Sequence, residues 1–331
     1  MSATPLSDTD LQPLDVVTFG EAMAMFVATE SGHLDQVDHY VRRAAGAELN
    51  VAIGLARLGM TSGWVSRVGN DAFGRFILAT LAKERVDCQS VTLDPTLPTG
   101  FQLKSKATVG TDPIVEYYRK GSAASQLSTA DFDPNYFGRA RHLHLSGVAA
   151  ALSAQSYELA AHAAQWMKLH GKTVSFDPNL RPVLWRSHQE MVSQLNKLAF
   201  SADWVLPGIN EGLILTGFAQ PEAIADFYLA GGAQAVVIKT GADGAFYKTA
   251  AGQSGVVPAI KVAKVVDTVG AGDGFAVGVV SALLEGLPLP EAIVRGNHIG
   301  ALAIQAIGDS EGLPDRQGLV RAMSVAAALT A

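Results

Sequence analysis

Cysteine is almost absent from this sequence, since Cys88 is the single one among 331 residues. One thiol excludes an intramolecular disulfide and a zinc site built from several cysteines, and it fits a reducing compartment such as the cytoplasm. The chain also lacks any continuous run of about eighteen apolar residues, the length that a membrane-spanning helix needs. We therefore expect a cytoplasmic protein without a membrane segment.

Positive charge is also scarce, with 25 Lys and Arg against 31 Asp and Glu and a formal net charge of −6. Nucleic-acid-binding domains are usually basic, so this balance argues against a nucleic-acid surface. Residues 1–14 lack both the basic start and the apolar core of a signal peptide. They mix Ser, Thr, Asp and Pro, and we expect a flexible tail there.

Hydrophobic residues make up 48% of the chain, which is enough for a substantial core. No repeat, low-complexity run or interdomain linker interrupts it, and we expect one α/β domain over residues 15–331. Beyond residue 140, short β-branched runs alternate with helical patterns, and this alternation predicts a mostly parallel sheet with helices on both faces. The expected strands are residues 16–19, 63–68, 141–145, 173–177, 204–206 and 235–239.

Residues 99–121 follow a different pattern, in which polar and apolar side chains alternate without a helical period. This pattern predicts two strands joined by a turn at residues 110–113. We expect a small second sheet, built from about residues 22–45 and 97–121.

The stretch from Val265 to Phe275 joins an apolar run, a glycine turn, a carboxylate and an apolar helix. The run before Gly270 predicts a buried strand, and the residues from Phe275 to Leu284 predict a helix. Because Gly270 and Gly272 have no Cβ, an anion can approach the backbone closely, where the first N–H groups of a helix have no partner. The turn therefore predicts a phosphate cradle.

Asp273 lies in the first turn of that predicted helix, and two interpretations of it stay open. It can be a residue that complements the helix dipole, worth well under about 1 kcal/mol when exposed. If the amides hold a phosphate group, the same carboxylate faces the acceptor as a candidate general base. Spacing alone favours neither interpretation.

The string Asp267-Thr-x-Gly-Ala-Gly-Asp273 resembles the C-terminal signature of the ribokinase-type, or PfkB-like, carbohydrate kinases. A second block resembles the family's first signature, although Ala45 stands where a second glycine is more usual. The matching residues of that block are Gly46, Asn50, Ala52, Leu58, Gly59, Gly69, Asp71, Phe73 and Gly74.

The resemblance spans nearly the whole chain and implies a ribokinase-like fold, with a Rossmann-type sheet and the small second sheet as a lid over a sugar site. It implies ATP and Mg²⁺, leaves a K⁺ requirement open, and implies a homo-oligomer whose contact is often the lid. In this family, amides matching Gly270, Ala271 and Gly272 form the anion hole, and the Asp matching Asp273 deprotonates the sugar hydroxyl.

The segment Tyr117-Tyr118-Arg119 lies on a predicted lid strand ahead of a Ser-Ala-Ala run. On sequence alone, exposed aromatic and basic side chains on strands pack across the sheet more often than they bind ligands. The segment, however, resembles the subgroup that phosphorylates 2-keto-3-deoxygluconate, in which the matching Tyr117 and Arg119 reach the substrate. A forked guanidinium can hold the carboxylate of this sugar acid with two hydrogen bonds.

The resemblance implies further substrate contacts, from Gly46, Asn50, Gln102, Arg181 and Asp309. Arg181 follows a predicted strand end, where open α/β sheets bind ligands, but a surface ion pair with Asp177 fits the sequence equally well. By sequence alone Asp309 is a turn former. Several relatives have a tyrosine at the position of Gln102, which bears on the exact substrate.

On the nucleotide side, the resemblance implies contacts from Lys239, Gly241, Gly244, Gly270, Gly272 and Asn297. A plain hairpin explains the loop after Lys239 equally well, and Asn297 also fits an ordinary polar position of a helix. Glu211 matches the glutamate of the family's Asn-x-x-Glu, which organises Mg²⁺ through water, but Gly208 replaces the Asn. An ordinary acid at a helix N-terminus is the alternative for Glu211.

Two further patterns mimic known sites. Gly171-Lys172-Thr173 ends like a P-loop, but it follows a predicted helix and precedes a strand, so we expect a helix C-cap. His142 and His144 alternate on a predicted strand without cysteine or carboxylate at ligand spacing, so we expect packing or hydrogen-bonding roles.

These features predict an ATP-dependent, Mg²⁺-assisted sugar kinase that phosphorylates the terminal hydroxyl of 2-keto-3-deoxygluconate. The alternative within the class is a kinase for a neutral sugar such as fructose or ribose, or for another keto-deoxy acid. From another class, a non-catalytic regulator that binds nucleotide or sugar also fits, because fold alone does not fix function. The intact string from Asp267 to Asp273 argues against the regulator, since a binding protein has no need of a base.

Overall fold

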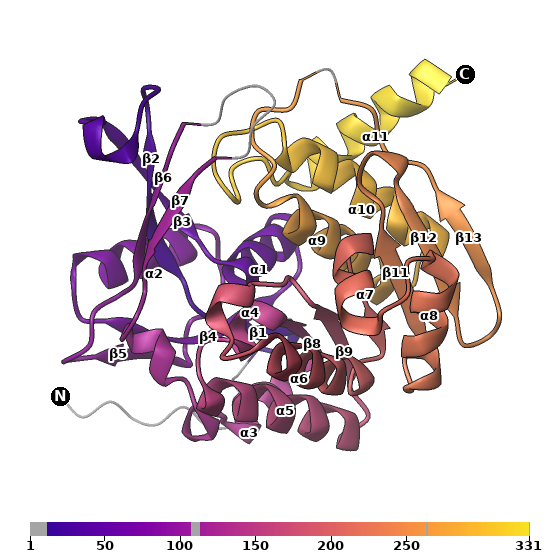
Figure 1. Ribbon diagram of the computed structural model, residues 1–331, viewed down its shortest axis with the longest axis horizontal. Coiled ribbons are helices and arrows are strands. Elements are labelled where there is room, and N and C mark those ends of the chain that lie inside the picture. The colour runs from indigo at the N-terminus through magenta and orange to yellow at the C-terminus, as the bar shows by residue number, and fades with distance from the viewer. Residues whose placement is uncertain (1–11, 107–112, 263, 331) are drawn as a thin grey trace.

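Two sheets organise the chain (Figure 1). The structure is a computed structural model that describes residues 12–106, 113–262 and 264–330. Over these residues the larger sheet has nine strands in the order β13-β12-β11-β10-β9-β8-β1-β4-β5. Its strands are β1 Leu14–Phe19, β4 Ser62–Gly69, β5 Val91–Asp94, β8 Ala140–Ser146, β9 Thr173–Asp177, β10 Trp204–Val205, β11 Ala235–Lys239, β12 Ala245–Thr249 and β13 Ser254–Val257. All pairings are parallel except those of β12 and β13, which add an antiparallel edge.

Both faces of the larger sheet are buried, because successive side chains on its central strands pack against different layers of helices. Val16 packs in the core formed with α1 (Ala47–Arg57), α9 (Ala271–Leu284) and α10 (Leu289–Ala303). Val17, one residue later, packs in the core formed with α5 (Ala154–Leu169), α6 (His188–Phe200) and α8 (Pro221–Ala230). Apolar strands covered on both faces are typical of parallel sheets. The predicted ribokinase-like α/β architecture is thus confirmed.

The other helices close the ends of the layers and connect the strands. They are α2 Ala72–Lys83, α3 Pro134–Arg139, α4 Gly147–Ala150, α7 Ile209–Thr216 and α11 Arg316–Thr330, with 3₁₀ helices at Leu34–Gln36, Ala123–Gln126, Thr129–Asp131, Pro182–Leu184 and Gly241–Asp243. No helix of the described chain combines the length and the apolar character that crossing a membrane requires.

The smaller sheet, called the lid sheet below, stands apart from the larger one at the upper left of Figure 1. Over the described residues its strand order is β3-β2-β6-β7, built from β2 Met23–Ala28, β3 Tyr40–Ala45, β6 Phe101–Lys104 and β7 Val115–Tyr118. β2 pairs antiparallel with β3 and parallel with β6, and β6 pairs antiparallel with β7. In that last pairing, Gln102 lies opposite Tyr117.

One predicted strand is wrong. Between the end of β13 at Val257 and the start of α9, the described residues form no strand, and Val265 is 44% exposed. The backbone N–H groups of Val266 and Asp267 donate instead to the carbonyl of Ile304, directly after α10. The segment before the glycine turn therefore finds its hydrogen bonds at a helix end and not in a sheet.

Two other expectations concern the chain's ends and turns. Leu14, expected at the end of a flexible tail, opens β1 and is buried, while residues 1–11 of that expected tail lie outside the described residues. Residues 110–112 of the expected turn in the lid sheet also lie outside them. The division of the chain into a tail, a domain and a lid stays a prediction.

The carboxyl ends of the parallel strands bring polar residues to one edge of the larger sheet. Ser146 ends β8, Asp177 ends β9 and Lys239 ends β11, while Glu21 follows β1 at the start of the lid sheet. Ligands of open α/β sheets bind outside the carboxyl ends of the strands. This edge, facing the lid sheet, is where the candidate site lies.

Candidate active site

Helix α9 begins directly after Gly270, whose backbone φ is +85°. A Cβ at this position would lie 2.3 Å from the backbone oxygen of Asp309, so the turn needs glycine for both its conformation and its space. The first N–H groups of a helix have no intrahelical acceptor, and they form the positive end of the helix dipole. This geometry fits the anion cradle that the sequence predicts.

We expect Gly270→Ala to lower the free energy of unfolding by several kcal/mol. The left-handed φ alone costs a residue with a Cβ about 1–2 kcal/mol, and the close approach of the Asp309 carbonyl adds to it. Gly286→Ala is the matched control, because Gly286 has a φ of +82° but open space around it. Urea unfolding of both variants measures the difference. Equal losses would show that the Asp309 carbonyl does not confine the turn.

Asp273 is buried in the first turn of α9, and two amide side chains hold its carboxylate. Nδ2 of Asn50 on α1 donates to Oδ2 at 2.7 Å, and Nδ2 of Asn179, just after β9, donates to Oδ1 at 3.3 Å. Asn179 has a φ of +39°, which is uncommon for a residue other than glycine. Backbone strain of this kind concentrates at functional sites. The two amides fix the direction in which Asp273 faces.

Burial raises the pKa of Asp273 to about 7. The hydrogen bond from Asn50 opposes this rise, while the negative charges of Asp177, Asp309 and Glu48 add to it. A general base works best when its pKa lies near the operating pH. The structure therefore favours the general-base interpretation over the exposed dipole-complementing carboxylate.

A first cavity of about 390 Å³ opens in front of Asp273 and the glycine turn. Its walls come from the strand ends, from α1 and from the lid sheet. The sequence-predicted residues that line it are Gly46, Asn50, Gln102, Tyr117, Arg119, Arg181, Glu211, Lys239, Gly270, Gly272, Asp273 and Asp309. The fold thus brings every predicted substrate residue to one cavity.

Ion pairs engage most of the cations that line this cavity. Nζ of Lys239 lies 2.7 Å from Oδ2 of Asp177, and Lys104 and Arg119 also pair with carboxylates. Among the described residues, Arg181 is the lining cation without a carboxylate at ion-pair distance, and its Nη1 donates to the carbonyl of Leu180. The alternative of a surface ion pair between Arg181 and Asp177 is therefore wrong. Arg181 is left free to meet an anionic ligand.

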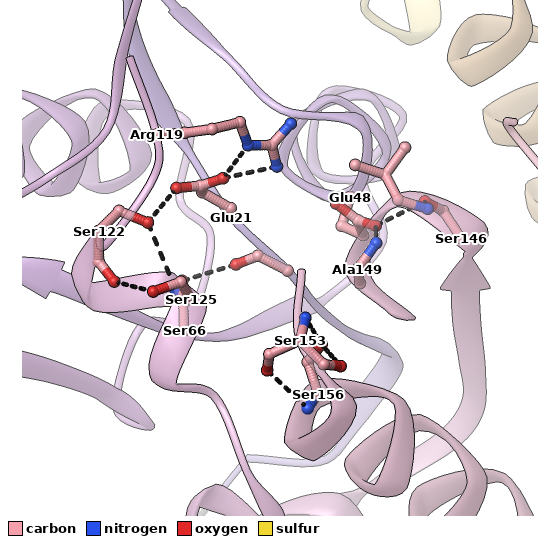
Figure 2. A network of polar contacts seen from close by, with 12 residues as sticks. Glu21, Glu48, Ser66, Arg119, Ser122, Ser125, Ser146, Ala149, Ser153 and Ser156 are labelled. Atoms are coloured by element: carbon pink, nitrogen blue, oxygen red, sulfur yellow. Dashed lines mark hydrogen bonds and ion pairs between the residues drawn. The ribbon is translucent and has the colours of Figure 1, made fainter. Parts of the chain in front are cut away.

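Figure 2 shows how Arg119 is held. Its Nε and Nη2 lie 2.6 and 2.5 Å from Oε2 of Glu21, and Oε1 of Glu21 accepts a hydrogen bond from Ser122. Glu21 is buried, so its carboxylate holds the guanidinium in one orientation. Within the described chain no hydrogen bond engages Nη1 of Arg119, which leaves donors for a ligand in the cavity.

A second cavity of about 660 Å³ lies on the other side of the glycine turn. Its lining is mostly apolar and includes Lys239, Gly241, Gly244, Gly272, Phe275, Asn297 and Ile304. Asn297 uses its Nδ2 to donate to the carbonyl of Pro258 at 2.8 Å, so that amide nitrogen stabilises the cavity wall. Lys239 and Gly272 line both cavities, which therefore meet beside Asp273.

Glu211 takes the position of a helix N-terminal acid. Its Oε2 accepts the N–H of Gly208 at 2.7 Å, and its Oε1 accepts the N–H of Leu180 at 2.9 Å. Within the described residues no group of three or more His, Cys, Asp or Glu could hold a metal ion by itself. Asp177 and Glu211 nevertheless line the same cavity, and Mg²⁺ in kinases usually takes one or two carboxylates together with substrate phosphates and water. The metal role of Glu211 stays a prediction.

The structure confirms the hydrogen-bonding role expected for His142 and His144 and the helix C-cap expected at Gly171. His142 contacts Thr173 and Ser175 through its two ring nitrogens, at 2.7 and 2.8 Å, and His144 contacts the same Ser175. Gly171 follows His170, the C-cap of α5, and has a φ of +68°, as a helix C-terminal glycine does.

Sequence reasoning missed several side chains that organise the site. Signals for them existed, because Glu21, Asp177 and Asn179 each follow or end a strand at the carboxyl edge of the sheet. Lys104 lies two residues after Gln102 on β6, and residues i and i+2 of a strand face the same side. These polar residues could have been identified in the sequence, either because they follow a predicted strand end or because they lie two residues from another site residue on a strand.

Comparison with known proteins agrees with this geometry. The model of the pfkB family carbohydrate kinase matches residues 13–316. A relative from Bacillus subtilis (strain 168), named 2-dehydro-3-deoxygluconokinase, is 53% identical over 312 residues, which cover 94% of this chain and 96% of the relative. A crystal structure of a PfkB protein from Polaromonas sp. JS666 is 51% identical with a TM-score of 0.86, covering 93% of this chain and 99% of the other.

A further solved structure, from E. coli and described as a Ribokinase II in complex with ATP and Mg²⁺, is 28% identical with a TM-score of 0.87. The alignment covers 94% of this chain and 99% of that one. The family match over residues 13–316 includes the strands of both sheets and the residues that line both cavities. The chain belongs to the pfkB family of carbohydrate kinases.

Proposed function

We propose that this enzyme phosphorylates the terminal hydroxyl of 2-keto-3-deoxygluconate, also called 2-dehydro-3-deoxygluconate, with ATP. The product would be 2-keto-3-deoxy-6-phosphogluconate. The observation that supports this proposal best is the position of Asp273, a buried carboxylate held by two amides where the two cavities meet. The 53% identity to the Bacillus subtilis relative supports the choice of this sugar acid.

In the proposed reaction, Asp273 accepts the proton of the terminal hydroxyl. The alcohol oxygen forms a bond to the γ-phosphorus of ATP, the bond from that phosphorus to the bridging oxygen breaks, and ADP leaves. The N–H groups of Gly270, Ala271 and Gly272 donate to the transferring phosphoryl group and stabilise the charge that develops on it. Lys239, half-buried where the two cavities meet and paired with Asp177, adds a positive charge.

The second cavity suits the nucleotide. Its apolar walls fit an adenine ring, and it meets the glycine turn at the end where the phosphates would lie. The turn fits a phosphate because a Cβ at Gly272 would meet nothing nearer than Nζ of Lys239 at 3.7 Å, so an anion can lie against the backbone. Bound Mg²⁺ would neutralise part of the charge of the phosphates. We propose that Asp177 and Glu211, which line the first cavity, would hold it through water.

The acid end of the substrate has candidate partners among the other residues that line the first cavity. Arg119 is oriented by Glu21 with Nη1 unoccupied, and Arg181 has no carboxylate partner among the described residues. Tyr117 lies on β7 beside Arg119 and lines the same cavity. A carboxylate gains charge-assisted hydrogen bonds from such groups, whereas a neutral ketose does not.

Release of ADP across a panel of sugars tests this proposal. The panel contains keto-deoxy acids, neutral ketoses, pentoses and nucleosides, each with ATP and Mg²⁺. We expect the largest kcat/KM with 2-keto-3-deoxygluconate. A larger kcat/KM with fructose or ribose would favour the neutral-sugar kinase, and no sugar-dependent release with any of them would favour the non-catalytic regulator.

The pH dependence of kcat/KM should report the ionisation of Asp273. Its pKa of about 7 means that the proton acceptor is lost as the pH falls through 7, so kcat/KM should rise with pH and level off above it. Asn50→Ala removes the hydrogen bond that stabilises the charged form, and the rise should then move to higher pH. The quantity to measure is the pH at which kcat/KM reaches half of its plateau, whatever the plateau value is. A rise that stays at the same pH in the variant would contradict the coupling between Asn50 and Asp273.

The homo-oligomer and the cytoplasmic location stay predictions, and a K⁺ requirement stays open. Each can be measured on the same purified protein, but none affects the assignment of Asp273.

A further inference from the structure

Lys104 is a buried lysine that the proposed reaction does not use. It ends β6 of the lid sheet, is 1% exposed, and its Nζ lies 2.6 Å from Oδ2 of Asp267 and 3.2 Å from Oδ1 of Asp309. Burial by itself lowers the pKa of Lys104, but the charges of Asp309 and Asp267 and their hydrogen bonds outweigh it and raise that pKa. The ammonium is therefore a fixed positive charge between two buried carboxylates.

The two carboxylates come from two separate segments that both contact the glycine turn. Asp267 opens the turn, and its Oδ1 accepts the N–H of Val269 at 3.1 Å. Asp309 packs its carbonyl against Gly270, at the place where a Cβ would lie. One ammonium thus holds both segments that confine the N–H groups proposed to bind the phosphoryl group.

The strand that supplies Lys104 also supplies a wall of the first cavity. Gln102 is two residues away on β6, pairs with Tyr117 of β7 and lines that cavity. The position of β6 therefore affects the sugar side and the phosphate side together. Lys104 also lines the cavity, but its ammonium is occupied by the two carboxylates, so it acts through them.

A second ion pair joins the lid sheet to the segment that contains Asp309, and it serves as a comparison for Lys104. Arg43 on β3 lies 3.1 Å from Glu311, and their side chains are 39% and 31% exposed. Ion pairs this exposed contribute little to stability, because water screens the two charges. Removing one partner of a fully buried pair costs much more, because an unpaired charge is left in the interior.

From this arrangement we propose that Lys104 is a positioning residue, which fixes the anion-hole turn relative to the lid sheet. The inference rests on the proposed function, since it concerns the turn that would bind the transferring group. Its consequence is that loss of the lysine affects kcat more than binding of ATP, whose second cavity does not include Lys104.

The test compares Lys104→Met with the double variant Lys104→Met/Asp267→Asn, using the sugar that the wild type phosphorylates best. Asp267→Asn removes one of the two carboxylates that the first change leaves unpaired, so the double variant should regain part of the lost thermal stability. If Lys104 positions the turn, kcat should stay about 10²-fold below the wild type in both variants, as expected for small misplacements near the chemistry. Arg43→Met is the matched control and should change kcat little.

Chemical rescue adds a measurement that a purely structural role would not move. In Lys104→Ala, added methylammonium chloride should raise kcat, because a small ammonium ion can enter the space left by the side chain. Recovery of kcat together with stability in the double variant would overturn the inference, and so would a folded Lys104→Met with kcat within about threefold of the wild type, a difference well below the effect of misplacement. A wild type inactive on keto-deoxy acids but active on another sugar would contradict the proposed substrate without bearing on Lys104.

Discussion

Asp273→Asn is expected to reduce kcat by about 10²- to 10⁴-fold, the range lost when a general base is removed. Asparagine keeps the size of the side chain and can still accept the hydrogen bond from Asn50, but it cannot take a proton. Binding of ATP should change little, because the second cavity is formed by other residues. Steady-state kinetics with 2-keto-3-deoxygluconate give kcat, and calorimetry with an ATP analogue gives the affinity.

Asp226→Asn is the matched control for this substitution. Asp226 is 58% exposed on α8, where it pairs with Lys248, so the same chemical change there should leave kcat unaltered. A folded Asp273→Asn enzyme with near-normal turnover would remove Asp273 from the mechanism. Loss of ATP binding in parallel with kcat would instead indicate a collapsed anion hole.

Removing the positive charge of Arg119 is expected to weaken use of the sugar acid far more than use of a neutral ketose. Hydrogen bonds to charged groups contribute about 1.5–3 kcal/mol, which corresponds to roughly a 10- to 150-fold fall in kcat/KM. Arg119→Ala alone would leave the buried Glu21 carboxylate without a cation to pair with and destabilise the protein. The double variant Glu21→Gln/Arg119→Met avoids that unpaired charge.

The informative quantity is the ratio of kcat/KM for 2-keto-3-deoxygluconate to kcat/KM for a neutral ketose. We expect this ratio to fall in the double variant and to be kept in Glu21→Gln, which retains the guanidinium. Equal losses for both sugars would contradict a carboxylate contact at Arg119. In that case Arg181, the lining cation without an acidic partner among the described residues, becomes the stronger candidate.

Much of this arrangement could be predicted from the sequence, because some residues are restricted by local chemistry. A glycine turn ahead of an apolar helix can be identified without tertiary information, and Gly270 and Asp273 lie where that pattern places them. The alternation of apolar strands and helices predicted the larger sheet, since strands covered on both faces have few alternatives.

The rest depended on contacts between distant segments. The strand expected before Gly270 is absent from the described chain because the carbonyl of Ile304 accepts the N–H groups of Val266 and Asp267, which no local pattern indicates. Lys104 and Asp267 are 163 residues apart in number, and their pairing follows only from how the lid sheet meets the core. Burial of this kind also sets the pKa of Asp273, so its value could not be inferred from spacing.

A crystal structure with the sugar acid and a non-hydrolysable ATP analogue would examine the site most directly. We expect the terminal hydroxyl within about 3 Å of the Asp273 carboxylate, as proton transfer requires, and the terminal phosphate against the N–H groups at the head of α9. A complex in which the carboxylate turns away from the sugar, with no phosphate at the glycine turn, would contradict the account.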